Sequence, residues 1–211
     1  MSFRRLMHQL AVVAVAVTAT SAIAASQAQA SPTSTTPATK TVVKRGMYIS
    51  GFDTAVAKAH GYKIVTYANG DRQAVPVNPR SSLPKGPVLV KNAGRLRPAN
   101  SGYDSAAGNC GTSWIYGDEI STSHISLESG FDLTDPAVAY NWVISLNDAN
   151  GTSEQSASGT LLERKTWEGT WNGLYQYEYT IDEVLTSSTV VLYDGSTCSS
   201  AGPYIVLSGL S

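Results

Sequence analysis

The clearest pattern of hydrophobic and polar positions lies between residues 138 and 147. Apolar residues occupy every second position there, and polar residues lie between several of them: Val138, Tyr140, Trp142, Ile144 and Leu146 alternate with Asn141, Ser145 and Asn147. This period of two predicts a half-buried β-strand. Further short apolar runs are separated by Gly, Asn, Asp and Ser; they lie at 114–116, 125–127, 159–162, 174–181, 189–193 and 204–207. Seven or eight such strands predict an all-β fold, a small β-sandwich or barrel-like domain, over about 109–211.

The segment at about 51–77 has a different pattern, which predicts a helix followed by a hairpin. Asp53 is placed to cap a helix over 54–60. Asn69-Gly70 then favours a tight turn between two strands, because both turn positions need a positive φ. A unit this small buries too little surface to be stable alone, so it must dock on another element or become ordered on binding. Residues 78–108 are rich in Pro and Gly and predict a linker.

Residues 1–30 have the features of a secretory signal peptide. Arg4 and Arg5 precede an apolar run over 10–25, and Ala28-Gln29-Ala30 provides the small residues that signal peptidase requires. A membrane anchor is the alternative, but this run spans 16 residues, whereas a spanning helix needs about 20. We therefore expect a secreted, extracellular protein of residues 31–211, with no membrane contact after cleavage.

Charge divides the remaining chain into two halves near Asn109. The full sequence has a net charge of −1, which gives no indication of nucleic-acid binding. Residues 31–108 contain eleven Lys and Arg against three Asp, a net +8, whereas 109–211 contain two basic and thirteen acidic residues, a net −11. We expect a basic extension over 31–108 and an acidic β-domain over 109–211.

Cys110 and Cys198 are the two cysteines of the chain, so they form the one intramolecular disulfide available. An oxidising destination favours that bond. The alternative is a reactive thiol, but Cys110 has no nearby His or basic residue in the sequence to lower its pKa.

The sequence assigns no catalytic residues. Residues 31–211 contain only His60 and His124 as histidines, and no Gly-x-Ser-x-Gly segment that would mark a serine hydrolase. His124 could be combined with many serines and acids, and thirteen acids make close carboxylate pairs inevitable, so neither feature is specific. The question of an enzyme is left open, with a non-catalytic protein preferred.

No metal site is assigned either, although Ca²⁺ is the one cofactor that the acidic half leaves open. Oxygen ligands gather at 132–135 and at 148–154. Neither segment has the spacing of an EF-hand loop. Ordinary Asx turns explain both segments.

The richest chemical feature is a group of aromatic residues over 167–179. Trp167, Trp171 and Tyr175 are the candidate ligand-binding residues, because exposed rings can stack on sugar faces. Trp167 and Trp171 flank Gly169, which predicts a turn and exposure. The alternation of Tyr175, Tyr177 and Tyr179 with polar residues predicts instead that these three rings share one strand face and point into the core.

Four short motifs carry a resemblance to a group of secreted actinobacterial proteins of unknown function. These are Asn-Cys-Gly-Thr-Ser-Trp at 109–114, Tyr-Asn-Trp at 140–142, Gly-Thr-Leu at 159–161 and Thr-Cys-Ser-Ser-Ala-Gly-Pro at 197–203. The resemblance covers about half of the chain after residue 30. It implies an extracellular β-domain closed by a disulfide, and it implies no activity.

Taken together, these observations predict a secreted, non-catalytic β-domain that recognises an extracellular or cell-wall partner, such as a wall polymer or glycan. The competing hypothesis is a secreted hydrolase, directed at glycans or peptides, with the basic half as a pro-segment. The basic half has two candidate roles: it attracts anionic wall polymers, or it docks on the acidic domain. The sequence leaves the oligomeric state open.

Overall fold

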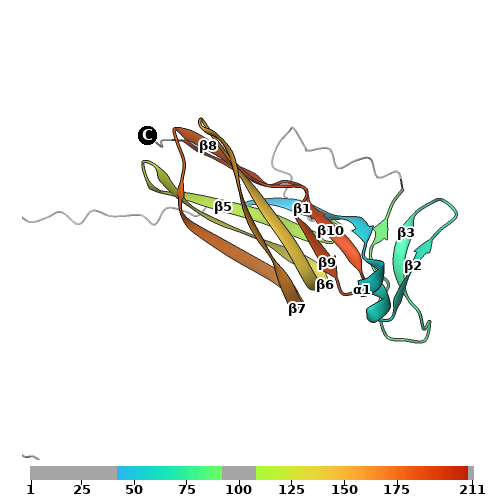
Figure 1. The fold of residues 1–211 in the computed structure, drawn as a ribbon. Helices are drawn as coiled ribbons and strands as arrows, with labels where there is room; N and C mark the ends of the chain where they lie inside the picture. The colour runs from blue at the N-terminus through green and yellow to red at the C-terminus, as the bar shows by residue number, and fades with distance from the viewer. Residues whose placement is uncertain (1–41, 92–107, 209–211) are drawn as a thin grey trace, which may run out of the picture. The chain divides into compact units, whose positions relative to one another are not determined.

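The computed structural model describes residues 42–91 and 108–208, and nearly all of its regular structure is β-strand (Figure 1). The all-β prediction is confirmed. The expected signal peptide (1–30), the tract that follows it and half of the linker lie outside the described residues.

Five strands form a closed barrel. They are β1 (Val43–Phe52), β5 (Gly111–Ser121), β6 (His124–Asp148), β9 (Thr189–Leu192) and β10 (Ser196–Ser200). The hydrogen-bonded order is β6-β5-β1-β10-β9, and β9 pairs again with residues 137–141 of β6, which closes the ring. All of these pairings are antiparallel.

Strand β6 and its partner β7 (Gly151–Tyr175) are far longer than the sequence pattern predicts, at 25 residues each. They form one hairpin that pairs from Asp148–Gly151 to His124–Tyr175, with register shifts between Asp132 and Ala137. Before this irregular segment β6 pairs with β5, and after it with β9 and then β8. Strand β6 therefore pairs with both of its barrel neighbours, with β5 through its first half and with β9 through its second half. Among the described strands, β7 pairs only with β6.

Two further strands extend the sheet beyond the barrel. Strand β8 (Tyr179–Val184) pairs with residues 144–147 of β6, and β11 (Tyr204–Ser208) pairs with β8. Strand β11 is thus the other edge of the sheet in the described part of the chain.

The structure places residues 43–52 differently from the sequence analysis, which assigned them to the basic extension. They form β1, between β5 and β10. Met47 and Ile49 are buried in the main core, and this burial accounts for the position of the strand. Lys44, Arg45 and Gly46 interrupt the apolar pattern, so the segment resembles a basic linker when its sequence is considered alone.

The predicted helix and hairpin are present and contact the barrel. Helix α1 (Thr54–Ala59) is followed by a second sheet of β2 (Tyr62–Thr66), β3 (Arg72–Pro76) and β4 (Val88–Leu89). Asp53 Oδ1 accepts hydrogen bonds from the backbone N–H groups of Ala55 and Val56, as a helix cap does. The Asp53 N–H also donates to the Gly195 carbonyl at 2.7 Å, and the His60 ring stacks on Tyr193. These contacts join the small unit to the turn between β9 and β10.

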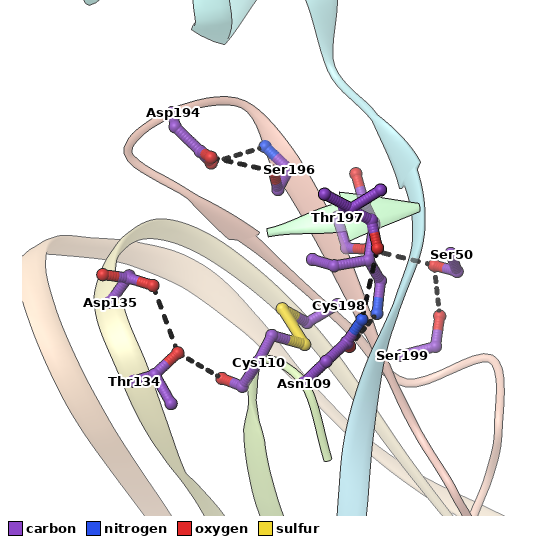
Figure 2. Close-up of a disulfide and its surroundings, with 12 residues drawn as sticks. Ser50, Asn109, Cys110, Thr134, Asp135, Asp194, Ser196, Thr197, Cys198 and Ser199 are labelled. Carbon is purple, nitrogen blue, oxygen red and sulfur yellow. Dashed lines mark hydrogen bonds between the residues drawn. A yellow bond between two sulfur atoms is a disulfide. The ribbon is translucent and has the colours of Figure 1, made fainter. Parts of the chain in front are cut away.

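The predicted disulfide between Cys110 and Cys198 is confirmed, which removes the reactive-thiol alternative. Cys110 leads into β5 and Cys198 lies in β10, so the bond joins the two strands that flank β1 (Figure 2). Strand β11, the last described strand, lies outside the bridged region. Both cysteines are fully buried in the main core cluster. Asn109 Oδ1 accepts from the Ile49 N–H at 3.0 Å, which adds a second connection to β1.

Candidate functional site

The three predicted ligand-binding residues all lie in the second half of β7, but they differ in exposure. Trp167 and Trp171 are partly buried and pack against the core, whereas Tyr175 is 61% exposed. The predicted turn at Gly169 is wrong, because Trp167 and Trp171 lie within the strand, opposite Phe131 and Leu127 of β6. A local sequence pattern could not predict this strand pairing, because the paired positions of β6 and β7 are about 40 residues apart in the sequence.

The predicted burial of three tyrosines is also wrong. Strand β7 ends at Tyr175 and β8 begins at Tyr179, with Glu178 between them at a φ of 62°. Tyr175, Tyr177 and Tyr179 are all exposed, and the residue that is buried instead is Gln176. The three tyrosines do share one side, but tertiary packing buries the opposite side, which carries Gln176.

Gly169 allows the two tryptophan rings on β7 to approach one another. A Cβ atom at position 169 would lie 2.8 Å from Trp171 Cη2 and 2.9 Å from Trp167 Cη2. Those distances are shorter than a van der Waals contact. The ring centroids lie 6.3 Å apart with an interplanar angle of 70°, an edge-to-face pair.

Aromatic residues of the core hold Trp167 in place. Its ring centroid lies 4.5 Å from that of Tyr140, 5.8 Å from that of Phe131 and 6.1 Å from that of Trp142. Trp142 is fully buried, and its Nε1 donates to Ser129 Oγ at 3.0 Å. Ser129 Oγ in turn donates to the Trp114 carbonyl at 2.7 Å. The buried network therefore fixes the strands that carry both Trp114 and Trp167.

A pocket of about 420 Å³ lies beside this cluster. Aromatic and aliphatic side chains form part of its wall, and polar or charged side chains form the remainder: Trp114, Phe131, Leu161 and Trp167, with Asp132, Arg164, Thr166 and Glu168. The volume is in the range of small-molecule sites, which combine apolar walls with a few orienting polar groups. Of the predicted residues, only Trp167 lines this pocket.

Trp114 is the site residue that the sequence analysis missed. It is half-buried and lies in a cross-strand row with Lys44, Gly130 and Glu168. A Cβ atom at position 130 would lie 3.0 Å from Trp114 Cζ2, so the indole extends over the glycine of the next strand. A glycine paired with a tryptophan is a typical arrangement for a ring that lies along a sheet surface. The pairing is not local in sequence, so only the structure reveals it.

His124 and the three carboxyl groups with raised pKa values lie outside this pocket. His124 begins β6, where its Nδ1 lies 3.1 Å from Ser123 Oγ and its ring contacts Tyr175 edge-on. Burial raises the pKa of Asp182 to about 6, with a smaller contribution from Asp148. Burial also raises the pKa values of Glu183 and Asp194. None of these four residues lines the pocket, whose carboxylates are Asp132 and Glu168.

Of the two segments considered for Ca²⁺, 148–154 contains a hydrogen-bonded turn, whereas 132–135 lies within strand β6, so the Asx-turn explanation is wrong for the latter. Asp148 Oδ1 accepts from the Asn150 N–H at 2.8 Å, and Oδ2 accepts from the Tyr177 N–H at 3.0 Å. Asp135 Oδ2 accepts from Thr134 Oγ1 at 3.1 Å. Across 42–91 and 108–208, no three His, Cys, Asp or Glu side chains are grouped in a way that could hold a metal ion.

A search for membrane-spanning helices within the described ranges identifies none of sufficient length and hydropathy. In comparisons with family models, curated proteins and solved structures, nothing matches this chain. The resemblance to secreted actinobacterial proteins therefore rests on its four sequence motifs. Of what it implies, the disulfide-bonded β-domain is observed.

Proposed function

We propose that the protein is a secreted, non-catalytic recognition module that binds a carbohydrate, such as a cell-wall glycan, in the pocket whose lining includes Trp114 and Trp167. The observation that carries this proposal is one cavity whose lining residues include two half-buried tryptophans together with charged residues. Sugars present apolar C–H faces that stack on aromatic rings, and hydroxyl groups that need hydrogen-bond partners at their edges.

The charged residues of the pocket supply both hydrogen-bond acceptors and a hydrogen-bond donor. Asp132 and Glu168 can accept hydrogen bonds from sugar hydroxyls, and Arg164 can donate. The aromatic cluster beneath Trp167 keeps the ring from rotating freely, so little side-chain entropy is lost when a ligand stacks on it.

Substitutions of tryptophan test the proposal directly. A glycan array followed by calorimetric titration of the best soluble oligosaccharide should show binding, and Trp114→Ala or Trp167→Ala should weaken it about tenfold or more. Trp171→Ala is the matched control, because Trp171 lies on the same strand but not in the pocket wall. Absence of binding to any sugar, or equal losses in all three variants, would contradict the proposal.

Hydrolysis of a glycan is the second candidate function. Asp132 pairs with Thr166, and Gly130 with Glu168, so the two pocket carboxylates are diagonal neighbours on adjacent strands. Such neighbours lie roughly 7–8 Å apart. Glycosidases use two carboxylates roughly 5–10 Å apart. Release of reducing ends that is lost in both Asp132→Asn and Glu168→Gln would favour this function over simple binding.

We further propose that the basic half strengthens attachment to anionic wall polymers and stays with the acidic domain. Its described part contributes β1 to the barrel and contacts the β9–β10 turn, so its removal would open the ring. A pull-down on isolated cell walls should retain the protein at low salt and release it at high salt. Lack of retention at low salt would remove the attachment role but not the pocket.

A further inference from the structure

Three Asn-Gly pairs occur in the sequence, and the fold holds their side chains to different degrees. They are Asn69-Gly70, Asn150-Gly151 and Asn172-Gly173. An asparagine followed by glycine is especially reactive towards deamidation, because glycine has no Cβ to hinder its backbone nitrogen. All three asparagines are exposed. Differences in reactivity among the three pairs therefore arise mainly from how each is held in the structure.

Deamidation at such a pair proceeds in two steps. The glycine nitrogen forms a bond to the asparagine Cγ, while the Cγ–Nδ2 bond breaks and ammonia leaves with the proton of the glycine N–H. The resulting succinimide then takes up water at one of its two carbonyl groups, which gives aspartate or isoaspartate. The first step requires the carboxamide to turn towards the glycine nitrogen, so hydrogen bonds that hold the carboxamide in another position slow the reaction.

Asn69-Gly70 is held at both polar atoms of the carboxamide. Asn69 Nδ2 donates to Asp71 Oδ2 at 2.7 Å, and Asn69 Oδ1 accepts from the Asp71 N–H at 3.1 Å. Asp71 is itself fixed, because its Oδ1 accepts from the Lys91 N–H at 3.0 Å. The Lys91 side chain also lies against Gly70. This turn is therefore the most constrained of the three.

Asn172-Gly173 is held at one atom of the carboxamide. The pair forms a bulge of β7 opposite Ser126. Asn172 Oδ1 accepts from Ser126 Oγ at 2.6 Å. A Cβ atom at position 173 would have no atom of a non-adjacent described residue within 4 Å. The hydrogen bond from Ser126 is thus the one observed restraint on this carboxamide.

Asn150-Gly151 lies at the turn between β6 and β7 and is the least constrained pair. The backbone N–H of Asn150 donates to Asp148 Oδ1 at 2.8 Å, but its carboxamide makes no hydrogen bond with the described residues. A Cβ atom at position 151 would also have no non-adjacent atom of the described chain within 4 Å. Gly151 pairs with Asp148 at the very end of the hairpin. Such a terminal pair opens more easily than the pairs within the ladder.

We propose that Asn150 is a site of spontaneous covalent modification, at which the carboxamide is converted to aspartate or isoaspartate with loss of ammonia. The product adds a carboxylate two residues from Asp148, and the isoaspartate form also lengthens the backbone of the turn by one methylene. Asp148 Oδ2 accepts from the Tyr177 N–H at 3.0 Å, so the change occurs beside a link between this turn and the segment that connects β7 to β8. Asn150 does not line the pocket, so the modification is independent of the proposed glycan binding.

Peptide mapping by mass spectrometry tests the proposal. The purified, folded protein is incubated at a mildly alkaline pH, the conversion of each asparagine is followed with time, and isoaspartyl methyltransferase labels the isoaspartate product. We expect Asn150 to react first. Asn172 should react about threefold more slowly or less, and Asn69 about tenfold more slowly or less, because one and two hydrogen bonds respectively must first be broken.

Two variants and a denatured sample are the controls. Ser126→Ala should accelerate the reaction of Asn172, and Asp71→Ala should accelerate that of Asn69, while Asn150 reacts as in the wild type. Circular dichroism confirms that both variants are folded. In guanidinium chloride the three asparagines should react at similar rates, because the restraints of the fold are lost. A folded protein in which Asn150 reacts no faster than the other two, or an order of rates that is unchanged in guanidinium chloride, would overturn the proposal.

Discussion

The candidate pocket and the outer surface of β8 rest on different interiors. Beneath Trp167 lie Phe131, Tyr140 and Trp142, aromatic side chains in mutual contact. Beneath the outer residues of β8 lie the polar side chains of Thr180 and Asp182. We refer to these regions as the aromatic interior and the polar interior.

The difference shows how one sheet can have both a closely packed region and a pH-sensitive region. In the aromatic interior, close packing and the Trp142–Ser129 hydrogen bond hold the pocket strands. In the polar interior, Asp182 Oδ1 accepts from Thr180 Oγ1 at 2.9 Å, while Oδ2 makes no hydrogen bond within the described residues. A buried carboxyl group with one partner favours its neutral form, so stability in this region depends on protonation.

The largest expected effect comes from removal of the disulfide, whose cysteines belong to the same core cluster as the aromatic interior. The double variant Cys110→Ala, Cys198→Ala removes a cross-link between residues 88 positions apart in the sequence. It should lose about 4–5 kcal/mol of unfolding free energy. Urea unfolding followed by tryptophan fluorescence measures the loss. Dithiothreitol should destabilise the wild type but not the variant, and an unchanged midpoint on reduction would contradict the prediction.

The next effect comes from Asp182, whose folded-state pKa is raised from 3.8 to about 6 by burial. Between pH 4 and 6 the folded state binds more protons than the unfolded state, so its stability falls as pH rises through this range. The loss should be about 2–3 kcal/mol, and Asp182→Asn should remove this dependence and be more stable at pH 7 by a similar amount.

Thermal unfolding at several pH values measures the Asp182 effect. Asp118→Asn, at an exposed position on β5, is the control and should change stability by less than about 0.5 kcal/mol. If the wild type and Asp182→Asn had parallel pH profiles, the polar interior would not be the pH-sensitive region.

Trp142→Phe addresses the aromatic interior with a smaller change. It removes a buried hydrogen bond to Ser129 and part of the ring, and should cost about 2 kcal/mol. Because no ionisable group is altered, the loss should be the same at pH 4 and pH 7. A loss that varied with pH would show that the two interiors are coupled.

Thr180→Val should give the smallest change in unfolding free energy, and it tests a single hydrogen bond of the polar interior. It keeps the shape of the side chain but removes the hydrogen bond that lowers the pKa of Asp182. The pKa of Asp182 should rise further, and stability at pH 7 should fall by about 1 kcal/mol. A carbon-detected NMR titration of the carboxyl group measures the pKa, and a downward shift would contradict this account.

Local patterns were sufficient to predict the β-rich fold, the helix with its hairpin and the disulfide. They succeeded because alternation, capping by Asp53 and the count of cysteines depend on neighbouring residues or on the chain as a whole. They failed for β1, where Lys44 and Arg45 concealed a strand, and for the tyrosines near Gln176, where tertiary packing buries the opposite side.

The candidate pocket was predicted only in part, because most of its lining comes together through long-range strand pairing. Trp167 was identified because aromatic residues cluster near it in the sequence. Trp114 was missed because its partners Gly130 and Glu168 come from other strands, which only long-range pairing brings together. The inward position of Asp182 was equally hidden, since tertiary packing decides which face of an alternating strand is buried.

The position of β1 limits how early the five-stranded barrel can close during synthesis of the chain. Met47 pairs with Ser200, so β1 finds this neighbour only after all the residues between the two strands have been translated. Until then β5 and β10 cannot be joined through it, and the partly made chain has open edges and a low capacity to fold. Ring closure should therefore be a late event that follows the synthesis of β10, which leaves β1 without this neighbour for most of that time.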